Sequence, residues 1–131
     1  MPRLQHVSTP IPSGAQEAVR AFYGGVLGLE EKEVPHTLKH LNLVWFSAGD
    51  GEMELHFVPS TILTAEGDPR HFCLVVEDLE AYRKRLIEAG HKIIEDTPIP
   101  NRPRFFCRDP LGNRIELTTI LGDYRDATPA S

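Results

Sequence analysis

Two pairs of residues in this chain combine an imidazole with a carboxylate, and the pairs fall at matched positions of the sequence. His6 and His71 each open a predicted strand, while Glu54 and Glu116 each lie in a predicted strand that follows a glycine-containing turn. Two imidazoles and two carboxylates suit a divalent ion of borderline hardness, such as zinc, iron, manganese, nickel or cobalt. The four residues are therefore candidate metal ligands.

His56 competes with Glu54 for the place of third ligand, because residues two apart in a strand share a face. The sequence repeat favours Glu54, whereas the affinity of imidazole for these metals favours His56, so both remain candidates. The other histidines lie in loop or solvent-facing contexts and are expected to be surface residues; they are His36, His40 and His91.

Alternation along the strands allows a second interpretation of the carboxylates. Glu116 lies between Ile115 and Leu117, and Glu54 is likewise flanked by apolar residues. Such strands pack one face on helices and present the other to water, or line a polar cup. Because the same residue types recur at matched positions, we favour metal binding.

The elements that would position these residues occur twice along the chain. The first half is predicted to contain strand 4–11, helix 14–27 with Ser13 as N-cap, short strand 30–34, strand 41–47 and strand 52–58. After a loop over 59–69, the second half is predicted to contain strand 71–77, helix 78–90 with Asp78 as N-cap, strand 91–96, strand 104–108 and strand 114–120. Residues 50–58 align without a gap on 112–120, which places Glu54 on Glu116.

The doubled pattern predicts an α+β fold of two βαβββ modules within a single domain. The expected boundaries are module 1 over 4–58, a linker over 59–70, module 2 over 71–120 and a tail over 121–131. A chain of 131 residues suits one domain, and a module of about 60 residues is too small to fold easily alone.

Composition and charge exclude several classes of partner. Hydrophobic residues make up 40% and charged residues 25%, as in ordinary soluble domains. The net charge of −5 disfavours a nucleic-acid partner, and no apolar run suits a membrane span or a signal peptide, so we expect a cytoplasmic protein. Cys73 and Cys107 are too few for a disulfide scaffold and are expected to be small core residues.

The segments RAFYGGVLGLE (20–30) and RDPLGNRIEL (108–117), with the doubled pattern and the paired histidines, resemble the vicinal oxygen chelate superfamily. This group includes glyoxalases, fosfomycin- and bleomycin-resistance proteins and extradiol dioxygenases, and the resemblance covers residues 4–120. It implies modules that each curve into half of an open barrel around a metal. The implied ligands are His6, Glu54 or His56, His71 and Glu116. Many members form homodimers, with modules pairing within one chain or between two.

The resemblance also implies a reaction class. Members bind two neighbouring oxygens of a small substrate to the metal, which predicts a metal-dependent lyase, isomerase or dioxygenase. Glu54 or Glu116 would then double as the group that moves a proton. Trp45, Arg104 and Phe106 are the candidates for substrate binding. The alternative is a metal-free protein of the bleomycin-resistance type that sequesters a small molecule; the complete ligand set argues against it.

Overall fold

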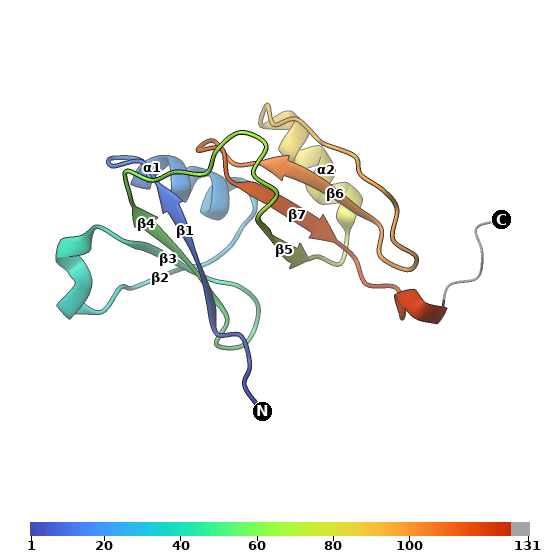
Figure 1. Cartoon of the computed structure of the whole chain (residues 1–131), viewed down its shortest axis with the longest axis horizontal. Helices are drawn as coiled ribbons and strands as arrows, with labels where there is room; N and C mark the ends of the chain where they lie inside the picture. Colours follow the sequence, from blue (N-terminus) through green and yellow to red (C-terminus); the bar gives the residue numbers. More distant parts are fainter. Residues whose placement is uncertain (127–131) are drawn as a thin grey trace. The chain divides into compact units, whose positions relative to one another are not determined.

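The structure, a computed structural model, describes residues 1–126 and divides into two compact units (Figure 1). Unit 1 comprises residues 1–68 and 110–113, and unit 2 comprises residues 69–109 and the residues from 114 onward. The division after residue 68 falls inside the predicted linker. Residues 127–131 of the predicted tail lie outside the described residues.

Unit 1 is a four-stranded sheet, in the order β1-β4-β3-β2, with one helical segment packed on it. Its elements are β1 (His6–Ile11), α1 (Gln16–Val19), a π-helix (Arg20–Val26), β2 (Glu31–Lys32), a 3-10 helix (His36–Leu41), β3 (Val44–Ser47) and β4 (Glu54–Pro59). Strands β1 and β4 pair in parallel, whereas β3 and β4 form the predicted antiparallel hairpin.

The helical segment of unit 1 holds the aromatic core. The ring of Tyr23 lies 4.4 Å from that of Phe57 and 6.1 Å from that of Phe46, measured between ring centroids. Phe22 and these three side chains are at most 1% exposed. These aromatic residues therefore fill the core on one face of the sheet.

The first helix differs from the predicted amphipathic α-helix in its hydrogen bonding. Ser13 does not cap it; the N-cap is Ala15, whose side chain makes no capping bond. After four α-helical residues the chain widens into the π-helix, and its last turn closes with Leu27 N donating to Phe22 O at 2.9 Å. Wider turns of this kind often occur at functional sites. Here the turn carries Phe22 and Tyr23, both buried in the core.

Unit 2 is a three-stranded sheet in the order β5-β7-β6, with a longer helix on one face. Its elements are β5 (His71–Val75), α2 (Leu79–Glu88), β6 (Arg104–Arg108), β7 (Arg114–Thr118) and a 3-10 helix (Tyr124–Asp126). Helix α2 buries Leu79 and Leu86 and lays the Arg83 guanidinium 4.8 Å from the ring centre of Phe105. Ile87 is 56% exposed, because it follows Leu86 by only one residue and turns away from the sheet.

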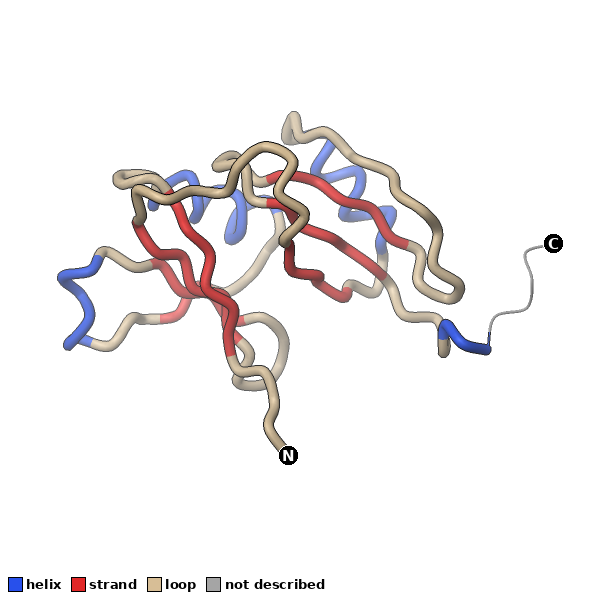
Figure 2. The backbone as a smooth tube through the Cα atoms, in the orientation of Figure 1, coloured by secondary structure: helices blue, strands red, loops and turns tan. Residues whose placement is uncertain are grey.

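The strand predicted over 91–96 is not formed as a strand. Only Ile94 pairs with the sheet, through an isolated bridge to Phe106 with two bonds of 2.8 Å. The chain then runs through a proline-rich stretch, drawn as loop in Figure 2. Proline lacks the N–H that a ladder requires, so Pro98 and Pro100 cannot donate to the sheet, although the residues directly after Ile94 are not prolines.

The α+β class is confirmed, with two small sheets and few helices. Each sheet is open, with β1 and β2 at the edges of one and β5 and β6 at the edges of the other. None of the helices described in residues 1–126 is long and apolar enough to cross a membrane.

Removal of the cap of α2 should destabilise unit 2. The Asp78 carboxylate accepts a hydrogen bond from Ala81 N at 3.1 Å, as predicted for an N-cap. We expect Asp78→Ala to lower the free energy of unfolding by about 1 kcal/mol, measured by urea denaturation, because the first turn loses an acceptor. Asp78→Asn keeps an acceptor and should change stability by a few tenths of that amount; equal losses in both variants would contradict the cap.

Candidate functional site

In each unit the predicted site residues lie on the face of the sheet opposite the helix. Side chains alternate between faces along a strand, and opposite partners on paired strands share a face. In unit 1, His6 lies opposite Glu54, and Trp45 lies opposite His56. In unit 2, Phe106 lies opposite Glu116, whereas the core residues Phe105 and Leu117 face the other way. In each unit the helix therefore covers the apolar face of the sheet, and the candidate site residues lie on the opposite face.

Glu54 is the centre of a small polar cluster in unit 1. Its Oε1 lies 3.0 Å from His56 Nε2, and its Oε2 lies 3.1 Å from Lys32 Nζ. Gln5 Nε2 donates a longer bond of 3.4 Å to Oε1. The hydrogen bond from His56, helped by Lys32 and Gln5, lowers the pKa of Glu54 to about 2 against the opposing effect of burial. Glu54 is therefore an ionised group across the ordinary pH range.

Three rings stack in sequence beside this carboxylate. The centroid of the Trp45 ring lies 3.8 Å from that of His56 at an interplanar angle of 2°, and the His6 ring lies 4.1 Å from the other side of His56 at 16°. His56 is 8% exposed between them. The stack fixes the His56 ring in the plane from which it reaches Glu54.

The hydrogen-bond network assigns different roles to the two imidazoles of unit 1. Because a carboxylate only accepts, His56 Nε2 carries a proton and donates to Glu54. The amide nitrogen of Gln5 donates to Glu52 O at 2.7 Å, so the Gln5 oxygen faces His6 Nδ1 at 2.7 Å and accepts its proton. His6 Nε2 therefore keeps its lone pair, as a metal ligand must.

In unit 2, His71 and Glu116 come together although they lie 45 residues apart in sequence, their Nε2 and Oε1 atoms being 3.0 Å apart. Arg104 donates to the other oxygen of Glu116 at 3.4 Å. The His71 ring meets the Phe106 ring edge-on, with centroids 4.9 Å apart. Side-chain exposure is 31% for His71 and 10% for Glu116. The predicted residues of this unit therefore form one partly covered cluster.

Both nitrogens of His71 face atoms that can only accept. Nδ1 lies 2.9 Å from the carbonyl oxygen of Pro69, and Nε2 lies 3.0 Å from the Glu116 carboxylate. A neutral imidazole carries one proton, so it satisfies one of these contacts and leaves a nitrogen lone pair against the other acceptor, either the Pro69 carbonyl or the Glu116 carboxylate, depending on the tautomer. Either a second proton or a cation held between Nε2 and Oε1 removes that conflict.

The strand register differs between the units by two residues. His6 lies directly opposite Glu54, but His71 lies opposite Arg114, and Glu116 lies opposite Cys73. Glu116 lies two residues beyond Arg114, the strand partner of His71. The equivalent residue in unit 1, two residues beyond the strand partner of His6, is His56 and not Glu54. The sequence repeat and the strand register thus match different residues, although all of them share the same face of their sheets.

The donors fit a divalent ion in pairs. The ligand atoms of a tetrahedral site lie roughly 3.3 Å apart when each is about 2.0–2.2 Å from the ion. The separation of 3.0 Å between His71 Nε2 and Glu116 Oε1 needs only a small opening to reach that value. A backbone carbonyl that binds the Nδ1 proton is also the usual support of a ligating histidine. Within residues 1–126 no group of three or more His, Cys, Asp and Glu side chains is gathered closely enough to hold an ion.

Two residues that were not predicted from the sequence lie on these faces, Lys32 in unit 1 and Arg114 in unit 2. Lys32 is part of the short edge strand β2, and its contact with Glu54 depends on the pairing of β2 with β3, which puts Lys32 opposite Trp45. Arg114 lays its guanidinium 4.0 Å from the ring centre of Phe106 and pairs with Asp96 at 3.3 Å. Alternation from Glu116 could have placed Arg114 on this face.

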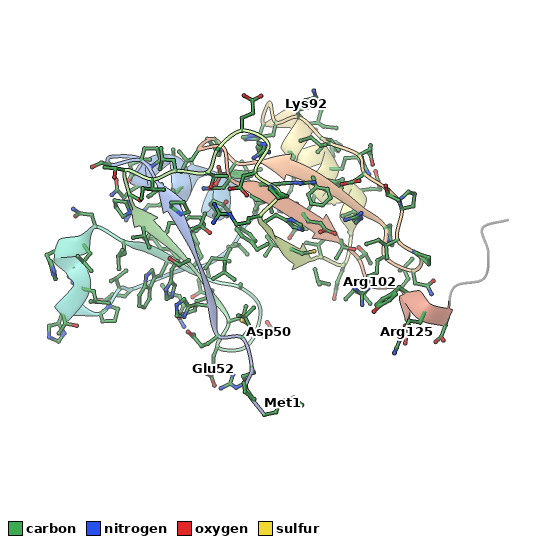
Figure 3. All side chains as sticks on the ribbon, in the orientation of Figure 1. Met1, Asp50, Glu52, Lys92, Arg102 and Arg125 are labelled. Atoms are coloured by element: carbon green, nitrogen blue, oxygen red, sulfur yellow. The ribbon has the colours of Figure 1, made fainter. Side chains whose placement is uncertain are left out.

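Arg102, Arg125 and Cys107 make none of these contacts, whereas Cys73 lies opposite Glu116 in the strand register, and burial followed by the charge of Glu116 raises the pKa of its thiol to about 11. Arg102 stacks on Tyr124 at 4.7 Å and shares one end of unit 2 with Arg125 (Figure 3). Cys107 is buried as expected, and burial raises its pKa to about 12. Cys73 is exposed rather than in the core, because β5 is an edge strand. His36 and His40 are exposed, as predicted, on the 3-10 helix of unit 1.

Comparison with known proteins identifies the family. The model of the Glyoxalase/Bleomycin resistance protein/Dioxygenase superfamily matches residues 3–117, and the chain belongs to this superfamily. It is 33% identical over 103 residues to the uncharacterized protein YwbC of Bacillus subtilis (strain 168), a match that covers 73% of this chain and 82% of that protein.

Two solved structures extend the comparison. A protein from Bacillus anthracis assigned to the glyoxalase family is 32% identical, with a TM-score of 0.82 over 92% of this chain and 96% of that one. TnmS3, an antibiotic-binding protein from Streptomyces sp. CB03234, is 22% identical, with a TM-score of 0.70 over 92% of this chain and 97% of that one. The fold is thus shared with a binding protein, so it does not by itself define a reaction.

Glu54 should make the stability of unit 1 depend on acid pH. Its folded pKa of about 2 lies below the ordinary value of 4.5, so its ionised form stabilises the fold above pH 4.5 and this contribution is lost as the pH falls towards 2. We expect the stability difference between wild type and Glu54→Gln to be about 1–2 kcal/mol at pH 6 and to vanish near pH 2.

The matched control for this pH series is Glu52→Gln. Glu52 pairs with Arg3 at the surface, with both side chains more than 60% exposed, so the substitution should cost less than about 0.5 kcal/mol. Denaturation curves between pH 2 and 7 provide the comparison. A Glu54→Gln difference that stays constant over this range would contradict the assignment.

Proposed function

We propose that the chain is a metal-dependent enzyme of its superfamily, acting on a small molecule that presents two adjacent oxygens. The proposed ligands in unit 1 are His6 and Glu54, and those in unit 2 are His71 and Glu116. The observation that carries the proposal is the contact of His71 Nε2 with the Glu116 carboxylate, while Nδ1 faces the carbonyl of Pro69. A divalent cation satisfies both atoms of that contact.

His56 is proposed to orient Glu54 rather than to bind the ion. Its Nε2 proton is already donated to Glu54, and its ring is held between Trp45 and His6. A carboxylate ligand fixed by a neighbouring imidazole is a common support of metal sites. We therefore propose Glu54, rather than His56, as the ligand.

The two carboxylates are proposed to differ in role. A bound divalent ion supplies Lewis acidity, polarising a substrate oxygen so that negative charge on it is stabilised. Glu54, with a pKa of about 2, is too weak a base to collect a proton and suits permanent coordination. We assign proton transfer to Glu116, whose Oε1 faces His71 and whose Oε2 accepts a longer bond of 3.4 Å from Arg104. Trp45 and Phe106 offer ring surfaces to the substrate.

A second candidate function is sequestration of a small molecule without a metal. It is favoured by the internal cations, because Lys32 Nζ lies 3.1 Å from Glu54 and Arg104 Nη1 lies 3.4 Å from Glu116. Each carboxylate already has a positive partner, so neither strictly requires an ion. The two acceptors that face His71 need a second proton or a cation, and because a divalent cation satisfies them we rank the metal-dependent enzyme first. The homodimer and the cytoplasmic location stay predictions.

Metal content is the direct test of this proposal. The protein is purified without an affinity tag, loaded with zinc, nickel, manganese, cobalt or iron(II), desalted and analysed by mass spectrometry. We expect about one ion per wild-type chain and, because each substitution removes a ligand, little or none in His71→Ala and Glu116→Ala. His40→Ala, on an exposed residue, should retain the full content.

Two further outcomes separate the roles within unit 1. His56→Gln should weaken metal affinity about 10- to 100-fold without abolishing it, because it removes support rather than a ligand. Glu54→Gln should abolish stoichiometric binding. Failure of the wild type to bind any of the five metals would overturn the enzyme proposal and favour sequestration.

A further inference from the structure

The turn between β6 and β7 belongs to unit 1, although both of these strands belong to unit 2. Residues 110–113 pack with unit 1, whereas Asp109 before them and Arg114 after them are part of unit 2. In the described part of the chain, the backbone therefore passes between the units at three points, after residues 68, 109 and 113. The predicted linker accounts for the first of these passages, and the turn accounts for the other two.

Asn113 holds this turn in unit 1 through its side-chain amide. Nδ2 donates to the carbonyl oxygen of Pro10 at 3.2 Å, and Oδ1 accepts a hydrogen bond from the Thr64 hydroxyl at 2.7 Å. The carbonyl can only accept, which fixes the orientation of the amide. Asn113 is 3% exposed, and a buried amide group that loses its partners destabilises the folded state.

The contacts of Asn113 join it to two separate segments of unit 1. Pro10 lies on the edge strand β1, whose first residue is His6, and Thr64 lies in the loop that follows β4. In the other direction, Asn113 leads directly into β7, which carries Glu116. The strand that Asn113 binds and the strand that it precedes thus carry candidate site residues of different units.

The internal repeat shows that such an anchor is not a general requirement of these hairpins. In the alignment of residues 50–58 on 112–120, the position of Asn113 is taken by Gly51. Gly51 is exposed, and a Cβ added there would meet no atom within 4 Å. The turn over 48–53 also stays in unit 1, the unit of its own strands. Of the two equivalent turns, the one that passes between the units is the one with a buried asparagine.

We propose that residues 110–113 act as a clasp that makes the two units unfold together, with Asn113 as the residue that closes it. When unit 1 unfolds, the clasp loses Pro10 and Thr64, and the adjoining ends of β6 and β7 lose a fixed connection. When unit 2 unfolds and releases the clasp, the Pro10 carbonyl of an edge strand loses this donor.

Each unit therefore stabilises the other through the clasp. A unit of roughly 60 residues buries a modest core, so support of this kind is a substantial part of its stability. The coupling involves no metal and no substrate, and it is independent of the proposed function.

Urea unfolding with one probe in each unit tests the clasp. Trp45, the single tryptophan of the chain, reports on unit 1 by fluorescence, and pulse labelling of the buried Cys107 thiol reports on unit 2 in a Cys73→Ser background. The two probes should give the same midpoint in this parent chain. With Asn113→Ala we expect two midpoints at least about 0.5 M apart, because both bonds of the amide are lost and the units then unfold separately.

Two further variants complete the experiment. Gly51→Ala, at the equivalent position of the other turn, should keep one shared midpoint. Thr64→Val preserves the shape of the side chain and removes one of the two bonds, so it should separate the midpoints by less than Asn113→Ala does, and it decides the question if Asn113→Ala does not fold. Separate midpoints in the parent chain would overturn the proposal. A shared midpoint in every folded variant would overturn it too, because Asn113 would then add stability without coupling the units.

Discussion

The contact between His71 Nε2 and the Glu116 carboxylate is the interaction on which the functional account depends. His71 Nε2 and Glu116 Oε1 lie 3.0 Å apart while His71 Nδ1 faces the carbonyl oxygen of Pro69, so a neutral imidazole, with its one proton, cannot donate to both. The parallel pairing of β5 with β7 sets the register of the two strands that carry these side chains. A second proton or a cation compensates this conflict. A divalent ion does so and also supplies Lewis acidity, which a proton in this position does not.

The fold accommodates such a contact because the residues that pack in the core and the polar site residues lie on opposite faces of each sheet. In unit 2, Phe105 and Leu117 bury one face of the sheet beneath α2, and in unit 1 Phe46 and Phe57 do the same beneath the π-helix segment. Because alternation assigns every second residue to the other face, the polar groups are placed by the same strands that are anchored by the core. Core residues and candidate site residues therefore alternate along the same strands. A substitution at a site residue need not disturb the packing of the core.

The sequence predicted the class of fold, and the sheet face on which the candidate site residues lie, better than it predicted local detail. Alternation around Glu116 and the N-cap at Asp78 both follow from short-range rules, and both are seen in the structure. The absence of a strand over 91–96 was not predicted, because local patterns do not show whether a segment pairs with the sheet. The π-helix was not predicted either, because it depends on how Phe22 and Tyr23 pack in the core. The counter-cation Lys32 was missed because its contact with Glu54 depends on long-range strand pairing, which local patterns do not encode.

The most direct test of the central claim is the protonation and coordination of the individual histidine nitrogens, observed by two-dimensional ¹⁵N NMR of the imidazoles as zinc is added. The account predicts that Nε2 of His6 and His71 changes on zinc binding while their Nδ1 atoms stay protonated, and that His56 keeps its Nε2 proton throughout. Zinc-induced loss of the His56 Nε2 proton, or no change at His71, would contradict it.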